Sequence, residues 1–127
     1  MSGCVELIGR PYRLGADGTG EDGAIDCIHL VYAVLAELDI PTPAFNPAWY
    51  SASRRRVARD LLHWGRRLAE PRYDGDVLLL PQDQMAFAVA WSQGILYINR
   101  FTQRVAWSLP EMVGECYAFR CCHLSAN

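Results

Sequence analysis

Ala24-Ile25-Asp26-Cys27-Ile28-His29-Leu30-Val31-Tyr32 is the stretch of sequence that decides the expected fold. From Ile28 to Leu38 the apolar residues recur at helical spacing. Residues 15–23 hold four glycines and three acidic residues, which predicts a loop before this helix. Asp26 is then the expected N-cap, and Cys27 lies in the first helical turn.

A cysteine at a helix N-terminus is a candidate nucleophile. The unpaired backbone N–H groups and the positive end of the helix dipole favour a thiolate over a thiol. The same N–H groups can stabilise the oxyanion that forms when a carbonyl is attacked. The ordinary alternative is that Cys27 packs as a small buried hydrophobic residue.

The order of motifs around Cys27 resembles the nucleophile segment of the NlpC-type cell-wall cysteine peptidases. Pro11-Tyr12-Arg13-Leu14-Gly15 is followed by a loop, Asp26-Cys27 and Leu30-Val31. The continuation Leu38-Asp39-Ile40-Pro41, followed by aromatic residues, looks most like the short versions carried by bacteriophage tails and gene-transfer particles. This resemblance implies a papain-like fold with Cys27 as the nucleophile.

The resemblance also assigns roles to Tyr12 and Asp26. It places Tyr12 and Asp26 in the part of the cleft that holds substrate and oxyanion, where the Tyr12 phenol can donate a hydrogen bond to either. Packing of Tyr12 under the loop is the alternative. The chain departs from the family at Ile28 and His29, where a small residue or tryptophan and then glycine are usual.

The expected general base is missing from the sequence. Alignment on Gly75-Asp76-Val77 and Gly94 puts the family's histidine at or beside Ala86. The polar residue that would orient this histidine falls at Ile98 or Asn99, of which Asn99 is chemically suitable.

Three histidines could replace the missing base. His29 lies two positions after Cys27 on the same helix, so the two side chains point to different sides. His63 lies in an arginine-rich segment, and His123 lies in the C-terminal tail. None of the three is placed in the site by its spacing.

The rest of the chain predicts an α+β fold. Ser51 or Ser53 caps a second helix that carries apolar residues inward and arginines outward. The inward residues are Val57, Leu61, Leu62, Trp64 and Leu68; the outward residues are Arg54, Arg55, Arg56, Arg59, Arg66 and Arg67. Strands are expected at 76–80, 85–91, 95–99, 104–107 and 115–120, with Ser92-Gln93-Gly94 as a hairpin turn. Helices followed by antiparallel strands make one α+β domain spanning residues 1–127.

Composition excludes several classes of function. With 127 residues, 51% hydrophobic residues and a net charge of −2, neither disorder nor nucleic-acid binding by bulk charge is expected. The sequence shows no signal peptide and no membrane-spanning stretch, and its five cysteines lack a disulfide framework's spacing. We expect a cytoplasmic or particle-associated protein.

No metal or cofactor is expected. Cys116, Cys121, Cys122 and His123 could bind zinc, but adjacent cysteines do not match the usual ligand spacing. Packing of Cys116 and Cys121 inside strands is the preferred interpretation. The acidic loop at 17–22 lacks the pattern of a calcium-binding loop.

Two functions of different classes follow from the sequence. In the first, Cys27 attacks an amide of a cell-wall peptide, and the resulting thioester is hydrolysed. In the second, the fold has lost catalysis and binds a peptide or serves as an assembly module, for example with phage-tail-like proteins. Ala86 favours the second function, and the retained Asp26-Cys27 pair favours the first.

Overall fold

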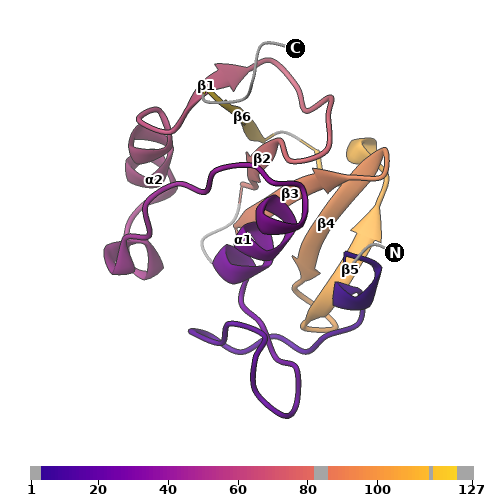
Figure 1. The fold of residues 1–127 in the computed structure, drawn as a ribbon. Coiled ribbons are helices and arrows are strands. Elements are labelled where there is room, and N and C mark those ends of the chain that lie inside the picture. Colours follow the sequence, from indigo (N-terminus) through magenta and orange to yellow (C-terminus); the bar gives the residue numbers. More distant parts are fainter. Residues whose placement is uncertain (1–3, 82–85, 115, 123–127) are drawn as a thin grey trace.

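The chain forms an antiparallel sheet of six strands with two helices before it (Figure 1). The computed structural model describes residues 4–81, 86–114 and 116–122. The helices are α1 (Cys27–Glu37) and α2 (Arg54–Leu61), with 3-10 turns η1 (Val5–Leu7), η2 (Pro47–Tyr50) and η3 (Pro110–Met112). The strands are β1 (Gly65–Leu68), β2 (Val77–Leu79), β3 (Phe87–Trp91), β4 (Gly94–Asn99), β5 (Arg104–Ser108) and β6 (Tyr117–Cys121), in the order β1-β6-β2-β3-β4-β5. The predicted α+β class is confirmed; the papain-like arrangement stays a prediction.

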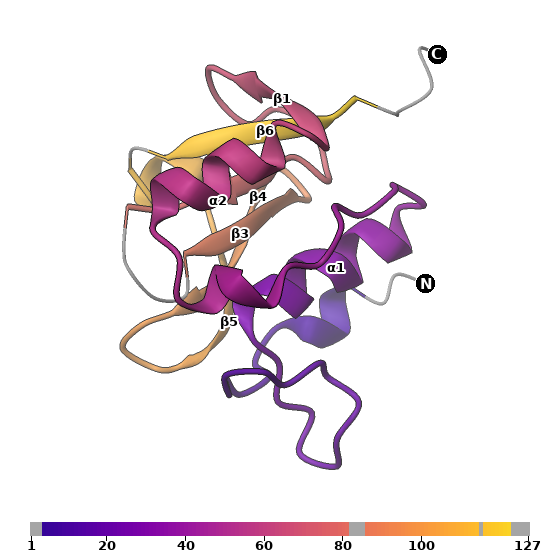
Figure 2. The same cartoon turned by 90° about the vertical axis from the view of Figure 1, so that its left-hand side faces the viewer.

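Both faces of the sheet are buried, and one of them carries the main core. Because side chains alternate along a strand, Val77 and Leu79 join the main core while Leu78 and Leu80 join a smaller cluster on the other face. Both helices contribute to the main core, α1 against β3 and β4 and α2 nearer β6 (Figure 2). The start of α1 is therefore held against the middle of the sheet.

Helix α1 begins and ends where the sequence predicts. The Asp26 side chain accepts a hydrogen bond from the backbone N–H of His29, so Asp26 is the N-cap and Cys27 is the first helical residue. At the other end Asp39 has a φ of 58°, a left-handed conformation that ends the helix before Pro41.

The second helix is shorter than predicted. Its N-cap is Ser53, which accepts from the N–H of Arg56, but α2 ends at Leu61, and residues 65–68 form β1. Leu62, predicted to point inward, is 54% exposed. Gly65 explains the change, because β6 comes so close that a Cβ at this position would collide with the carbonyl oxygen of Arg120.

The five predicted strands correspond to β2–β6, although the predicted starts at Met85 and Glu115 lie outside the described residues. Ser92 and Gln93 have φ values of 53° and 65°, which make a tight hairpin turn between β3 and β4. At the start of β2, Asp76 is buried and accepts two hydrogen bonds from the Arg120 guanidinium of β6 at 2.9 and 3.0 Å. This ion pair joins the two neighbouring strands β2 and β6.

Candidate active site

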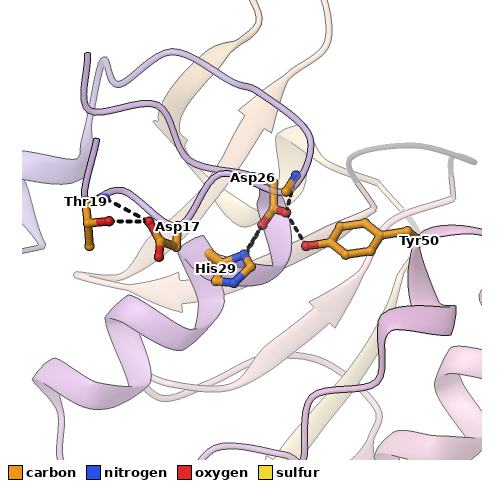
Figure 3. Close-up of polar contacts among 6 residues, drawn as sticks. Asp17, Thr19, Asp26, His29 and Tyr50 are labelled. Carbon is orange, nitrogen blue, oxygen red and sulfur yellow. Dashed lines mark hydrogen bonds and ion pairs between the residues drawn. The ribbon is translucent and has the colours of Figure 1, made fainter. Parts of the chain in front are cut away.

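Asp26 organises the candidate site at the N-terminal end of α1. Its carboxylate is 1% exposed and accepts from the N–H of Gly15, the N–H of His29 and the hydroxyl of Tyr50, at 3.0, 2.8 and 2.5 Å. The His29 Nδ1 lies 2.8 Å from the same carboxylate (Figure 3). One buried carboxylate thus ties together the loop before α1, the helix itself and η2.

Cys27 follows Asp26 and lines a cavity of about 310 Å³. The walls come from the N-terminal loop, from α1, from the η2–α2 segment and from the sheet. They are made by Tyr12, Leu14, Asp26, Cys27, Ile28, Trp49, Tyr50, Ala52, Arg54, Val57, Leu79, Ala86 and Phe87. Most of these side chains are apolar, so the cavity suits a small organic ligand.

The Cys27 thiol is buried and stays protonated. Its pKa is raised to about 12, chiefly by burial and to a smaller extent by the nearby Asp26 charge, while hydrogen bonding to the backbone of Phe87 offsets part of the rise. This direction is opposite to the one expected from the helix N-terminus, because the cost of desolvating the thiolate outweighs the backbone N–H groups. Cys27 therefore lies at the predicted helix N-terminus, but its thiol pKa is not lowered there.

Two tyrosines share the cavity with Cys27. Burial raises the pKa of Tyr12, and the neighbouring Cys27 and Asp26 add to this rise. The pKa of Tyr50 is raised by burial and by its hydrogen bond to Asp26. Both phenols therefore stay protonated at neutral pH. Tyr12 both lines the cavity, as the resemblance implies, and packs against the core under the loop.

The position at which a base is expected faces the same cavity. Ala86 lines it together with Cys27, although the two are far apart in the sequence. Of the histidines, His29 is bonded to Asp26 and packs against Phe45, with ring centroids 5.7 Å apart. His63 lines a separate groove, and His123 lies outside the described residues. Among the residues that the structure describes, no imidazole lines the cavity.

No protein-family model matches the chain, and no curated protein matches it.

Asn99 is placed away from the cavity. Its side-chain oxygen accepts hydrogen bonds from the N–H groups of Phe101 and Thr102, at 2.9 and 3.1 Å. These bonds hold the turn between β4 and β5. Asn99 therefore stabilises this turn and does not line the Cys27 cavity. No described contact supports its predicted role in orienting a catalytic histidine.

Arg54 is the site residue that the sequence analysis assigned to the wrong place. It was expected among the outward arginines, but it lines the cavity, and its guanidinium lies over the ring of Tyr117 at 4.4 Å. The signal was available, because Arg54 precedes Val57 and Leu61 at helical spacing and so shares their inward face. Arg55 and Arg56, which follow it directly and are exposed, make the whole run look outward-facing.

The described residues that could bind a metal do not form a metal site. Within residues 4–81, 86–114 and 116–122, no group of three or more His, Cys, Asp or Glu side chains could hold a metal ion. Asp17 accepts from Thr19, and Asp22 pairs with Arg13, so these loop carboxylates are engaged within the loop. Cys121 is buried in β6, as predicted, whereas Cys116 is half-buried. Nor is any described helix long and apolar enough to cross a membrane.

Proposed function

We propose that the protein is an NlpC-like domain, of papain-like fold and peptidase origin, whose Cys27 cavity binds a peptide ligand without efficient hydrolysis. The observation that carries this proposal is the cavity itself, in which Cys27 and Ala86 share the walls and no described imidazole is present. The ligand is a cell-wall peptide or a peptide segment of a partner, as in a phage-tail-like assembly.

The raised pKa of the Cys27 thiol favours peptide binding without hydrolysis. With a pKa of about 12, only about one Cys27 thiol in 100,000 is ionised at pH 7. Attack on an amide requires the thiolate, and expulsion of the amine requires a proton donor. Loss of the general acid–base group costs about a hundredfold or more in each step that uses it. Apolar walls, by contrast, favour ligand binding whether or not chemistry follows.

An active cysteine amidase is the second candidate. It is favoured by the cavity that Cys27 and Asp26 share with Tyr12 and Tyr50, because a nucleophile then lies in one cavity with two protonated phenols. The pairing of His29 with Asp26 resembles the carboxylate–imidazole pair that orients a catalytic base. However, His29 does not line the cavity that holds the Cys27 thiol.

Incubation of the protein with a muropeptide digest separates these candidates. We expect the amide resonances of Cys27 and Ile28 to shift in a ¹⁵N correlation spectrum while chromatography detects no new product. The Cys27→Ala variant, which keeps the cavity, should bind comparably. Product formation by the wild-type protein that disappears in Cys27→Ala would overturn the proposal in favour of the amidase.

A further inference from the structure

Arg54 is half-buried and lines the cavity. Its Nη1 is buried and has no hydrogen-bond partner among the described residues. Buried polar groups are nearly always paired, and leaving a charged donor unpaired is costly. The Tyr117 ring supports the guanidinium from one side at 4.4 Å but offers no hydrogen bond to Nη1. Among the residues that the structure describes, Arg54 Nη1 therefore lacks an acceptor.

Two described carboxylates, one in the cavity wall and one on helix α2, do not supply that acceptor. Asp26, in the wall of the same cavity, is engaged by Gly15, His29 and Tyr50. Asp60, on the same helix as Arg54, accepts from the indole N–H of Trp49 at 2.9 Å. Neither appears in an ion pair with Arg54, so its charge is not neutralised by them.

The surroundings make the Arg54 end of the cavity positive. Arg67 of β1 lies over the ring of Tyr117 at 4.3 Å, so two guanidinium groups contact one phenol ring. At the α1 end, the buried Asp26 raises the pKa of Cys27 and is a source of negative charge. A ligand with a single negative charge at the Arg54 end matches this distribution.

We propose that Arg54 binds a carboxylate of the ligand, so that the cavity recognises a peptide through an acidic side chain or a C-terminus. This inference rests on the proposed peptide-binding function and names the group that anchors the peptide. One unpaired donor and apolar walls made by Trp49, Val57 and Phe87 fit a carboxylate carried on an aliphatic stem. A phosphate dianion would be repelled more strongly by Asp26 and would leave most of its oxygens without donors.

The test compares two probes that differ only in this charge. N-acetyl-L-alanyl-L-alanine and its C-terminal amide are titrated into the full chain, and dissociation constants are taken from shifts of the Ile28 amide and the Trp49 indole N–H. The acid should bind about tenfold or more tightly than the amide, because a charge-assisted hydrogen bond is lost in the amide. In Arg54→Met the two probes should bind alike.

Arg56→Met is the matched control. Arg56 lies in the same helical turn and is exposed, so its substitution removes the same charge without touching the cavity. The preference for the acid should persist in this variant.

The outcomes distinguish failure of the carboxylate site from failure of the proposed peptide-binding function. Equal binding of acid and amide to the wild-type protein would overturn the carboxylate site but not the peptide-binding cavity. Binding of neither probe would overturn both. Displacement of the acid by an equal concentration of orthophosphate would overturn the carboxylate assignment in favour of a phosphate site.

Discussion

Substitution of Ala86 by histidine tests whether the cavity has the geometry of a cysteine peptidase site. Ala86 lines the cavity beside Cys27, so Ala86→His places an imidazole in the same space. A protonated imidazole close to a thiol lowers the pKa of the thiol by about 1–3 units. From a starting pKa of about 12, this raises the thiolate fraction at neutral pH about 10–1000-fold.

The expected rate change is smaller than the change in thiolate fraction. A thiolate of lower pKa is a weaker nucleophile, and this cancels about half of the gain on a logarithmic scale. Iodoacetamide alkylation of Cys27 at pH 7 should therefore become about 3–30 times faster in Ala86→His. The rate is followed by mass spectrometry of digested protein, with the exposed Cys122 as the internal reference.

Ala106→His is the control for this experiment, because Ala106 is half-buried on β5 and does not line the cavity. It should leave the alkylation rate of Cys27 unchanged. If Ala86→His folds normally and also leaves the rate unchanged, Ala86 does not stand where a base would stand, and the papain-like reasoning is refuted.

Three further measurements test the framework around the site. Arg120→Met leaves the buried Asp76 carboxylate without its ion pair, so urea denaturation should show a loss of about 3–5 kcal/mol; a loss below about 1 kcal/mol would contradict the assignment. Gly65→Ala should destabilise by more than about 1 kcal/mol, because the added Cβ collides with a β6 carbonyl, and an unchanged unfolding midpoint would refute the close approach. The Cys27 pKa is raised from 9.0 to about 12, so the neutral thiol favours folding below pH 9 and this contribution is lost as the pH rises toward 12. Stability should fall more steeply over that range in the wild-type protein than in Cys27→Ala, and parallel curves would exclude a raised thiol pKa.

The nucleophile segment was predictable because its signals are local. The polar, glycine-rich loop, the N-cap Asp26 and the apolar spacing after Ile28 act within a few residues of one another. The structure accordingly begins α1 at Cys27. The hairpin was predictable for the same reason, since two strand patterns flank Ser92-Gln93-Gly94; the structure keeps Ser92 and Gln93 in the turn and places Gly94 at the start of β4.

The end of the second helix was not predictable from periodicity. Leu61, Leu62, Trp64 and Leu68 continue an apolar pattern through Gly65, but pairing with β6 converts residues 65–68 into a strand. That pairing joins segments 50 to 56 residues apart in the sequence, and its only local sign is Gly65.

The electrostatics of Cys27 also depended on tertiary structure. Helix position alone predicts a lower thiol pKa, yet the burial that raises it comes from η2, β3 and the N-terminal loop closing around the cavity. The contact of Arg54 with Tyr117 of β6 likewise depends on tertiary structure, although its spacing to Val57 and Leu61 already places it on the inward face of α2.

The pH dependence of Cys27 alkylation in the unmodified protein tests the central claim most directly. Rates for each cysteine are measured by mass spectrometry from pH 6 to 11. We predict that Cys27 reacts more slowly than Cys122 throughout and shows no inflection below pH 10, as expected for a buried thiol of raised pKa. Fast alkylation at pH 7 with an inflection below the free-thiol value of about 8.5 would contradict the account and identify Cys27 as an activated nucleophile.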